Sequence, residues 1–221
     1  MSSIAPPTIR ILFDFISPYA YLAWTQIHAV AERHRASVEP VPVLFAALLN
    51  AHGQKGPAEI PAKRVYVFKD VLRHAHRLGI PLTPPPTHPF NPLLSLRAAS
   101  LDLPADRRRA LIDALYRATW GGGGGVEGAA AVAAQARSVG LDGEEIVAMA
   151  STEASKARLR RQTEEAIAAG AFGVPTMLVG KELFWGFDSF GHLEAHLDGK
   201  DPLDNALLER WATLGASASR I

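Results

Sequence analysis

Hydrophobic positions at the start of the chain predict a strand, a helix and a second strand. Residues 9–15 (IRILFDF) are rich in branched and aromatic side chains, which is typical of a buried strand. Between residues 18 and 35 the apolar positions recur with a period near 3.6, which predicts a helix. Residues 38–45 (VEPVPVLF) predict another strand, and its two prolines favour a sheet edge because proline cannot donate to a ladder. We expect the two strands of this βαβ unit to be parallel.

The pattern changes between about residue 57 and residue 169, where amphipathic helical patterns follow one another. Glycines and a proline-rich stretch, PLTPPPTHPFNP, separate these helices, and we find no strand pattern among them. A long all-helical block between strands is best explained as an insertion that forms a lid.

Strand patterns return near the end of the chain. Residues 174–180 (VPTMLVG) and the short run ELFWG predict two strands, and Gly180-Lys181 between them is typical of a tight hairpin. Asp188 and Ser189 then open a last amphipathic helix, FGHLEAHL, after which we expect a polar tail.

The order βαβ, helical insert, ββα predicts an α/β fold. At 221 residues the chain is long enough for one domain with a large insertion. We therefore predict one domain formed by residues 1–45 and 170–221, and an inserted helical domain formed by residues 46–169.

Composition and charge narrow the classes of function. Apolar residues make up 48% and charged residues 20%, as in a folded globular protein. A net charge of +1 gives no electrostatic case for a nucleic acid or a membrane as partner. The chain has no cysteine, which excludes disulfides, zinc thiolate sites and a thiol nucleophile of its own. Without a signal peptide at residues 1–8 or a run of ~18 to 20 apolar residues, we expect a cytoplasmic protein.

Two further patterns add no separate chemistry. His74 and His76 lie two positions apart on a predicted helix, so they face different directions and we expect no metal site there. The glycine run at 121–125, together with Gly128, satisfies the motif G-x-G-x-x-G. In dinucleotide-binding proteins this motif follows a strand, whereas here a helical pattern precedes it, so we do not predict a dinucleotide site. We interpret the run as a flexible loop.

The junction Ser17-Pro18, within FDFISPYAYL, ends the first strand and starts the first helix. Ser17 suits the N-cap of that helix and Pro18 suits its first turn. The junction also lies at the carboxyl end of a strand, where α/β folds place ligands, and a helix N-terminus offers free N–H groups to an anion. No histidine lies nearby and no G-x-S-x-G motif occurs, so Ser17 as a triad nucleophile is unsupported.

A hydroxyl at this junction can instead stabilise the anion of a bound thiol. The helix dipole contributes roughly 0.3 to 1 kcal/mol, and a hydrogen bond to a charged group contributes roughly 1.5 to 3 kcal/mol. Together they would lower a thiol pKa from ~8.5 to about 6 or 7, so that most of the thiol is ionised at neutral pH. The hydroxyl is the larger of the two contributions.

Three motifs, FDFISPYAYL, FGVPT at 172–176 and WGFDS at 185–189, resemble those of thioredoxin-like proteins with a DsbA-type helical insertion. Within that group the chain is similar, over nearly its whole length, to bacterial 2-hydroxychromene-2-carboxylate isomerases and kappa-class glutathione transferases. The resemblance implies that the two outer segments form a thioredoxin-like domain. It also implies that Ser17 stands where the oxidoreductases of the fold keep a cysteine, and that its hydroxyl donates to the sulfur of bound glutathione.

The resemblance assigns further residues to glutathione binding. Pro175 resembles a cis-proline that turns the backbone of Val174 toward the cysteinyl part of glutathione, whereas the residues alone also allow a trans proline at a strand start. Asp188 matches the position that receives the γ-glutamyl amine, and it also suits an N-cap. Ser189 replaces an arginine of many relatives, a departure that removes a charged contact. Gln54, in HGQKGP, matches a glutathione-contacting asparagine of the kappa enzymes.

An anionic, hydroxylated aromatic substrate would need a cation and hydrogen-bond donors from the insertion. Lys63, for the carboxylate, and Asn91, for the keto oxygen, are our candidates for substrate binding, with Tyr66 and His88 in the same segment. The alternative is that Lys63 is solvated and Asn91 caps the following helix. We expect three tryptophans to build core rather than a stacking wall: Trp24, Trp120 and Trp185.

We therefore predict a glutathione-dependent isomerase that interconverts 2-hydroxychromene-2-carboxylate, or a related aromatic catabolite, and trans-o-hydroxybenzylidenepyruvate through transient thiolate addition. A kappa-type glutathione transferase that forms conjugates, and a glutathione-binding module without activity, are the alternatives. The resemblance further implies aromatic catabolism in bacteria and a homodimer as a candidate assembly.

Overall fold

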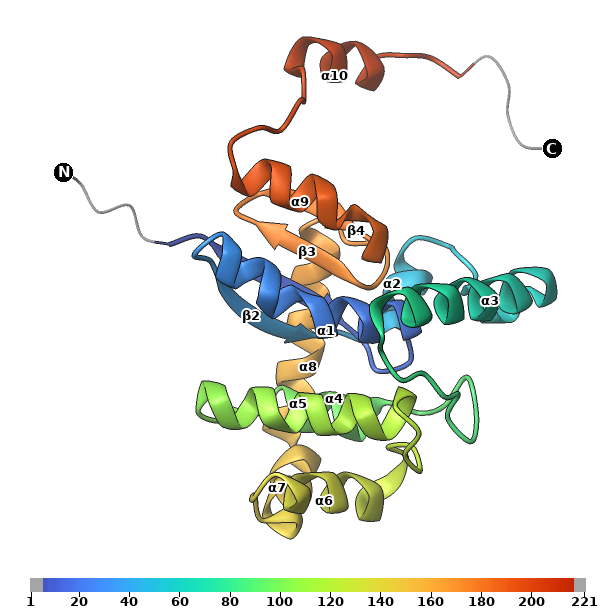
Figure 1. The fold of residues 1–221 in the computed structure, drawn as a ribbon, viewed down its shortest axis with the longest axis vertical. Helices are drawn as coiled ribbons and strands as arrows, with labels where there is room; N and C mark the ends of the chain where they lie inside the picture. The colour runs from blue at the N-terminus through green and yellow to red at the C-terminus, as the bar shows by residue number, and fades with distance from the viewer. Residues whose placement is uncertain (1–5, 217–221) are drawn as a thin grey trace.

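Four strands form a single mixed sheet in a computed structural model that describes residues 6–216 (Figure 1). The strand order is β2-β1-β3-β4. β1 (Thr8–Phe13) pairs in parallel with β2 (Ser37–Pro42), with Ile11 opposite Pro40. β3 (Thr176–Val179) is antiparallel to β1, and β4 (Glu182–Trp185) is antiparallel to β3. The prediction of a parallel first pair with the proline-containing strand at an edge is confirmed.

The ends of the first elements differ from the predicted ones. β1 ends at Phe13 rather than at residue 15, because Asp14 starts a turn in which its main-chain oxygen accepts a hydrogen bond from the Ser17 N–H at 3.1 Å. The following helix, α1 (Pro18–Arg33), ends two residues earlier than predicted. Arg35, at a φ of 53°, then turns the chain toward β2.

Helices make up most of the remaining structure. The inserted segment is helical with no strand of the named sheet, as the pattern predicted, and the chain ends in further helical elements. Their bounds are α2 (Phe45–Ala51), η1 (Pro57–Glu59, a 3-10 turn), α3 (Pro61–Leu78), α4 (Leu93–Ala99), α5 (Ala105–Trp120), α6 (Gly128–Ser138), α7 (Gly143–Ser151), α8 (Glu153–Ala168), η2 (Phe187–Ser189, a 3-10 turn), α9 (Phe190–Leu197) and α10 (Asn205–Ala212).

The sheet is covered on both faces. In Figure 1, α1 and α9 lie in front of it, and α8 rises behind it from the inserted helices at the bottom of the view. Ile9 and Ile11 of β1 belong to the cluster that contains α1 and α9, whereas Leu12 packs on the other face with Leu178 and with Ala166 of α8. Successive side chains of β1 therefore pack against helices on opposite faces of the sheet, as is usual for a strand buried on both sides.

The insertion shares its core with the sheet. The ring of Tyr116, on α5, lies 5.8 Å from the ring of Phe13 and 4.8 Å from that of Phe15. The indole Nε1–H of Trp120 donates to the main-chain oxygen of Phe15 at 2.8 Å. One cluster of buried side chains contains all of these residues. The division into two domains at residues 45 and 170 stays a prediction, and the packing across it is continuous.

Two helices differ from the sequence-based expectation. α2 occupies residues 45–51, where only the end of a strand was expected, and α10 occupies part of the expected polar tail. α10 is amphipathic but buries no side chain, and Trp211 on it is 72% exposed. Figure 1 shows it apart from the rest of the molecule, at the end of an extended linker. The expectation of a polar tail was therefore wrong for this segment, where four apolar residues at helical spacing follow the linker: Leu207, Leu208, Trp211 and Leu214.

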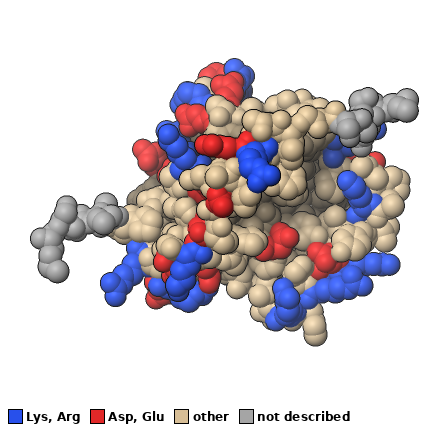
Figure 2. Space-filling model, turned by 90° about the horizontal axis from the view of Figure 1, so that it is seen from above, with Lys and Arg blue, Asp and Glu red and all other residues tan. Residues whose placement is uncertain are grey.

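The surface carries charges of both signs. On the face shown in Figure 2, basic and acidic side chains are interspersed around uncharged areas, in keeping with the net charge of +1. Of the helices within residues 6–216, none combines the length and the apolar character that crossing a bilayer requires.

Candidate active site

Ser17 occupies the N-cap of α1, at the carboxyl end of β1. Its Oγ accepts a hydrogen bond from the Ala20 N–H at 3.2 Å, and Pro18 takes the first helical position. The hydroxyl also donates to the main-chain oxygen of Val174 at 3.4 Å, a long bond across 157 positions of sequence. The residue is only 8% exposed. The fold thus places this hydroxyl between a helix N-terminus and the residue that precedes Pro175.

The segment before β3 presents its backbone at the same place. The Val174-Pro175 peptide bond is cis, and the oxygen of Pro175 accepts from the Gly186 N–H at 2.9 Å. The N–H of Val174 donates to none of the residues that the structure describes. A buried N–H without a partner is uncommon, because leaving it unpaired costs free energy. This donor is therefore available to a ligand that lies alongside Val174.

Any side chain at position 173 would collide with the tryptophan that packs on this segment. A Cβ at Gly173 would lie 2.5 Å from Nε1 of Trp185. The indole also packs against Phe172, with ring centroids 5.0 Å apart. Trp185 is 52% exposed, whereas Trp24 and Trp120 are buried, so the expectation of a core role holds for two of the three tryptophans. Trp185 instead covers the glycine of the FGVPT motif.

The turn that contains Asp188 lies next to this segment. It forms η2, and the Gly186–Pro175 hydrogen bond ties it to the start of β3. The hydroxyl of Ser189 donates to the oxygen of Gly186 at 2.8 Å, and Ser189, rather than Asp188, occupies the N-cap of α9. Asp188 is exposed, and its carboxylate has no hydrogen bond or ion pair with any described residue. Its charge is near enough to Tyr19 to raise the pKa of that phenol, after burial and Asp70.

Gln54 makes no described contact with these residues. It is exposed and follows α2, where its N–H donates to the oxygen of Leu49 at 2.9 Å. The structure therefore brings Ser17, Val174 and Pro175 together with the turn of Asp188, and it gives no contact between this group and the side chain of Gln54.

Asp14 is a buried carboxyl directly behind Ser17. Its Oδ1 accepts from the Ile16 N–H at 3.0 Å and its Oδ2 accepts from the Phe45 N–H at 2.9 Å. Burial raises the pKa of Asp14 to about 7, although both hydrogen bonds act to lower it. This carboxyl thus joins the turn of Ser17 to the start of α2.

A second polar network joins α1 to α3, and no local pattern in the sequence predicts it. The hydroxyl of Tyr19 donates to Oδ2 of Asp70 at 2.7 Å, and Nε2 of His74 lies 3.4 Å from the same oxygen. The partner of His74 is thus Asp70, one helical turn away, rather than His76. The pairing of Tyr19 with Asp70 spans 51 positions of sequence, so only the folded chain reveals it.

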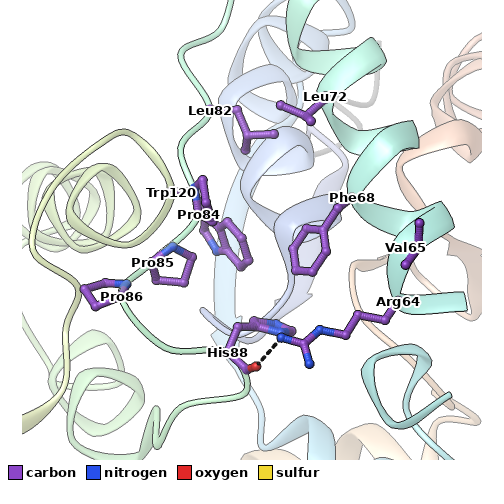
Figure 3. Close-up of a pocket in the computed structure, with 10 residues that line it drawn as sticks. All are labelled: Arg64, Val65, Phe68, Leu72, Leu82, Pro84, Pro85, Pro86, His88 and Trp120. Carbon is purple, nitrogen blue, oxygen red and sulfur yellow. Dashed lines mark hydrogen bonds between the residues drawn. The ribbon is translucent and has the colours of Figure 1, made fainter. Parts of the chain in front are cut away.

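An apolar pocket of about 420 Å³ opens beside the Ser17 turn (Figure 3). α3 forms one wall, the proline-rich loop forms another, and the end of α5 closes it. His88 connects the pocket to the turn, because its Nε2–H donates to the oxygen of Ile16 at 3.0 Å. Burial lowers the pKa of His88, so its ring is neutral at neutral pH. The lining residues are Arg64, Val65, Phe68, Leu72, Leu82, Pro84, Pro85, Pro86, His88 and Trp120.

The glycine run packs closely against the end of α5 beside this pocket. The Gly125 N–H donates to the oxygen of Ala118 at 2.9 Å, and a Cβ at Gly123 would lie 2.6 Å from Cα of Ala118. A Cβ at Gly125 would touch the ring of Pro86. A helix precedes the run, as expected, and the glycines serve this close approach of backbone to backbone.

The two residues expected to bind the substrate do not line the pocket. Lys63 is exposed on α3, one position before Arg64. Oδ1 of Asn91 accepts from the Leu93 N–H at 3.0 Å, just before α4, whereas the N-cap position of that helix is Pro92. The Asn91 N–H donates to Glu127. Arg64, which is also exposed, is instead the cation that lines the pocket. Sequence reasoning missed it because the rotation of α3 decides which of two neighbouring cations lies at the pocket.

Comparison with known proteins gives consistent matches. The model of the DSBA-like thioredoxin domain matches residues 8–198. A 2-hydroxychromene-2-carboxylate isomerase of Sphingobium xenophagum is 30% identical over 192 residues, 86% of this chain and 97% of its own. Glutathione S-transferase kappa 1 of Homo sapiens is 23% identical over 93% of each chain. A solved 2-hydroxychromene-2-carboxylate isomerase superposes with a TM-score of 0.80 at 26% identity, covering 95% of this chain and 100% of its own.

Proposed function

Since the chain belongs to the DSBA-like thioredoxin domain family, in the group of 2-hydroxychromene-2-carboxylate isomerases and kappa-class glutathione transferases, we propose that it is a glutathione-dependent isomerase of small aromatic carboxylates. Relatives with these names support an enzyme of isomerase or glutathione-transferase type. The proposal adds the cofactor, the residues that bind it and the chemistry of the substrate.

One observation carries the proposal. The hydroxyl of Ser17 lies at the N-terminus of α1 and against the backbone of Val174. The preceding residue, Ile16, is hydrogen-bonded to His88, which lines an apolar pocket. In a chain without cysteine, this is a place for a thiol that comes from elsewhere. The hydroxyl can donate to a sulfur anion by giving up its long bond to Val174, and the dipole of α1 favours negative charge at the same point.

The residues present fit an extended tripeptide such as glutathione. The unpartnered N–H of Val174 suits a peptide carbonyl, as in the addition of a strand to a sheet edge. The carboxylate of Asp188, which has no partner among the described residues, suits the γ-glutamyl ammonium group. Ser189 and Gln54 are the further proposed contacts. The hydroxyl of Ser189 donates to the oxygen of Gly186, so it can accept a hydrogen bond from the ligand, and Gln54 is exposed on the segment after α2.

Ser17, Val174 and Asp188 would hold glutathione, which would supply a thiolate nucleophile for a reversible covalent isomerisation in which glutathione is not consumed. The protein lowers the thiol pKa through Ser17 and the helix N-terminus. The apolar pocket holds the aromatic ring next to that position and excludes water from it. His88, neutral and fixed by its bond to Ile16, is part of the wall between the pocket and the Ser17 turn.

A kappa-type glutathione transferase is the second candidate function. The human and rat kappa-class relatives match 93% and 89% of this chain, and the proposed thiolate site would serve either reaction. Product analysis separates the two functions. A transferase consumes glutathione in proportion to product, whereas an isomerase leaves the glutathione concentration unchanged.

The role of Ser17 is tested with two variants that separate the hydroxyl from the helix cap. Ser17→Gly keeps an acceptable N-cap but removes the hydroxyl, and Ser17→Thr keeps both. We expect Ser17→Gly to raise the pKa of bound glutathione by about one to two units, read from thiolate ultraviolet absorbance, and to lower kcat about tenfold to hundredfold. Ser17→Thr should retain most of the activity.

If Ser17→Gly leaves both the thiol pKa and kcat at saturating glutathione unchanged, Ser17 is not the group that stabilises the thiolate. If glutathione binds without any depression of its thiol pKa in the wild-type protein, the binding module without activity is the better description.

A further inference from the structure

The pocket next to the Ser17 turn contains a single charged group. Of its ten lining residues, Arg64 alone is charged at neutral pH, and the others are apolar apart from the neutral ring of His88. No carboxylate of the described residues lies within 4.0 Å of the Arg64 guanidinium. Its only described side-chain hydrogen bond runs from Nη2 to the main-chain oxygen of His88, at 3.2 Å. A guanidinium held by one carbonyl retains most of its five donors for another partner.

The rings of the pocket are arranged to hold a flat ligand. Figure 3 shows Phe68 on one side, Trp120 and the prolines on the other, and His88 at the end that the Arg64 side chain reaches. The ring of His88 lies 5.5 Å from that of Phe68 and 5.6 Å from that of Trp120. A volume of about 420 Å³ lies within the range of roughly 300 to 1,000 Å³ that small-molecule pockets usually have.

We propose that Arg64 binds the carboxylate of an aromatic acid whose ring lies between Phe68, His88 and Trp120. This inference rests on the proposed function, because it names the group that recognises the substrate. A guanidinium pairs with a carboxylate through two parallel hydrogen bonds, which fixes the direction of the acid as well as its charge. Arg64 is then a specificity-determining residue, and it selects anionic over neutral aromatic compounds.

Lys63 supplies the matched comparison. It precedes Arg64 on the same helix, carries the same charge and is exposed, but it does not line the pocket. Replacement of either residue by methionine changes the net charge equally. A general attraction of anions to this helix would therefore affect both variants alike, whereas a specific pair would affect Arg64→Met alone.

Binding is measured without glutathione and without turnover, so that the result does not depend on the isomerase reaction. The probes are cinnamate and its neutral amide, titrated against tryptophan fluorescence or by calorimetry. We expect Arg64→Met to weaken cinnamate binding about tenfold or more, and to leave binding of the amide within about twofold. Lys63→Met should bind both probes like the wild type. Arg64→Lys, which keeps the charge without the planar fork, should give an intermediate loss.

Three results would overturn the proposal. Equal losses in Arg64→Met and Lys63→Met would show a general electrostatic effect. A loss confined to Lys63→Met would assign the carboxylate to the residue expected from the sequence. An unchanged cinnamate affinity together with a weaker calorimetric affinity for glutathione in Arg64→Met would show that the partner of Arg64 is the glycine carboxylate of glutathione. Circular dichroism of each variant identifies a folding defect, and Arg64→Lys then carries the test.

Discussion

On the sheet side of the site the groups proposed to bind glutathione are held by backbone, whereas on the insertion side the pocket is made of side chains. Ser17 and Val174 are each only 8% exposed, and they are positioned by β1, the start of α1 and the start of β3. Val65 and Leu72, at the pocket, are 56% and 52% exposed and project from one face of α3.

The two sides of the site should therefore differ in how well they tolerate substitution. A substitution on the sheet side disturbs hydrogen bonds of buried backbone groups, and leaving such groups unpaired costs free energy. A change on the α3 side alters a largely exposed wall with little effect on the folded state. We expect the cofactor side to be constrained by folding and the substrate side to be free to adapt.

Of the substitutions on the two sides, we expect the one at Asp14 to have the largest effect on the free energy of unfolding. Its pKa is raised from 3.8 to about 7 by burial, so the folded protein holds this proton more tightly than the unfolded chain does. The contribution to stability is complete below about pH 4 and is lost as the pH rises through about 7, a total of about 4 kcal/mol. His28, whose burial lowers its pKa to about 4, acts in the opposite direction, so the wild-type curve alone does not isolate Asp14.

Asp14→Asn serves as the reference for this experiment. Asparagine cannot accept from both the Ile16 and the Phe45 N–H groups, and that cost does not change with pH. The difference in free energy of unfolding between wild type and variant, from urea titrations at about pH 4 and about pH 8, should therefore shift by about 4 kcal/mol in favour of the variant at the higher pH. A difference that stays constant across this range would mean that Asp14 titrates normally.

A smaller effect is expected at Gly173, also on the sheet side. Gly173→Ala places a Cβ 2.5 Å from Nε1 of Trp185, and relief of the clash requires the indole to move. We expect a loss of about 1 to 3 kcal/mol in free energy of unfolding. In the double variant Gly173→Ala/Trp185→Ala the indole is absent, so the added Cβ no longer clashes. The loss caused by Gly173→Ala should therefore be much smaller in the Trp185→Ala background than in the wild type. Gly124→Ala, where an added Cβ meets nothing within 4 Å, is the control and should be close to neutral.

The smallest effect is expected on the pocket side, at Val65. Val65→Ser replaces a side chain that is 56% exposed, so the free energy of unfolding should change by no more than about 0.5 kcal/mol. Cinnamate affinity should fall only about twofold to threefold, because part of an apolar wall is lost but the guanidinium stays. A stability loss as large as that of Gly173→Ala would contradict the division between a constrained and an adaptable side.

Local signals made the sheet side of the site predictable. Ser17-Pro18 at the end of a strand is a helix start by short-range rules alone, and the structure has it as an N-cap followed by Pro at the first helical position. The parallel strand pair followed from its hydrophobic runs and prolines. The cis peptide bond before Pro175 was predicted from the family resemblance and not from a local sequence pattern.

The pocket side depended on information that no local pattern carries. Lys63 and Arg64 are adjacent, and a rotation of α3 by about 100° decides which one faces the pocket. The sequence allows Asn91 to be a substrate ligand or a helix cap; in the structure its amide oxygen accepts from the Leu93 N–H, and Pro92 occupies the N-cap. Tyr19 and Asp70 meet only because α1 and α3 pack together. Residues that act through tertiary contact are therefore the ones that sequence reasoning missed.

The detached position of α10 has a spectroscopic consequence. Trp211 is 72% exposed and sits on a helix that buries nothing, while Trp24 and Trp120 are shielded from solvent. A chain shortened after Asp201, which pairs with His196, would thus lose a red-shifted emitter while keeping the described contacts of α9. In such a chain the intrinsic emission would report more directly on the indole that touches the aromatic acid.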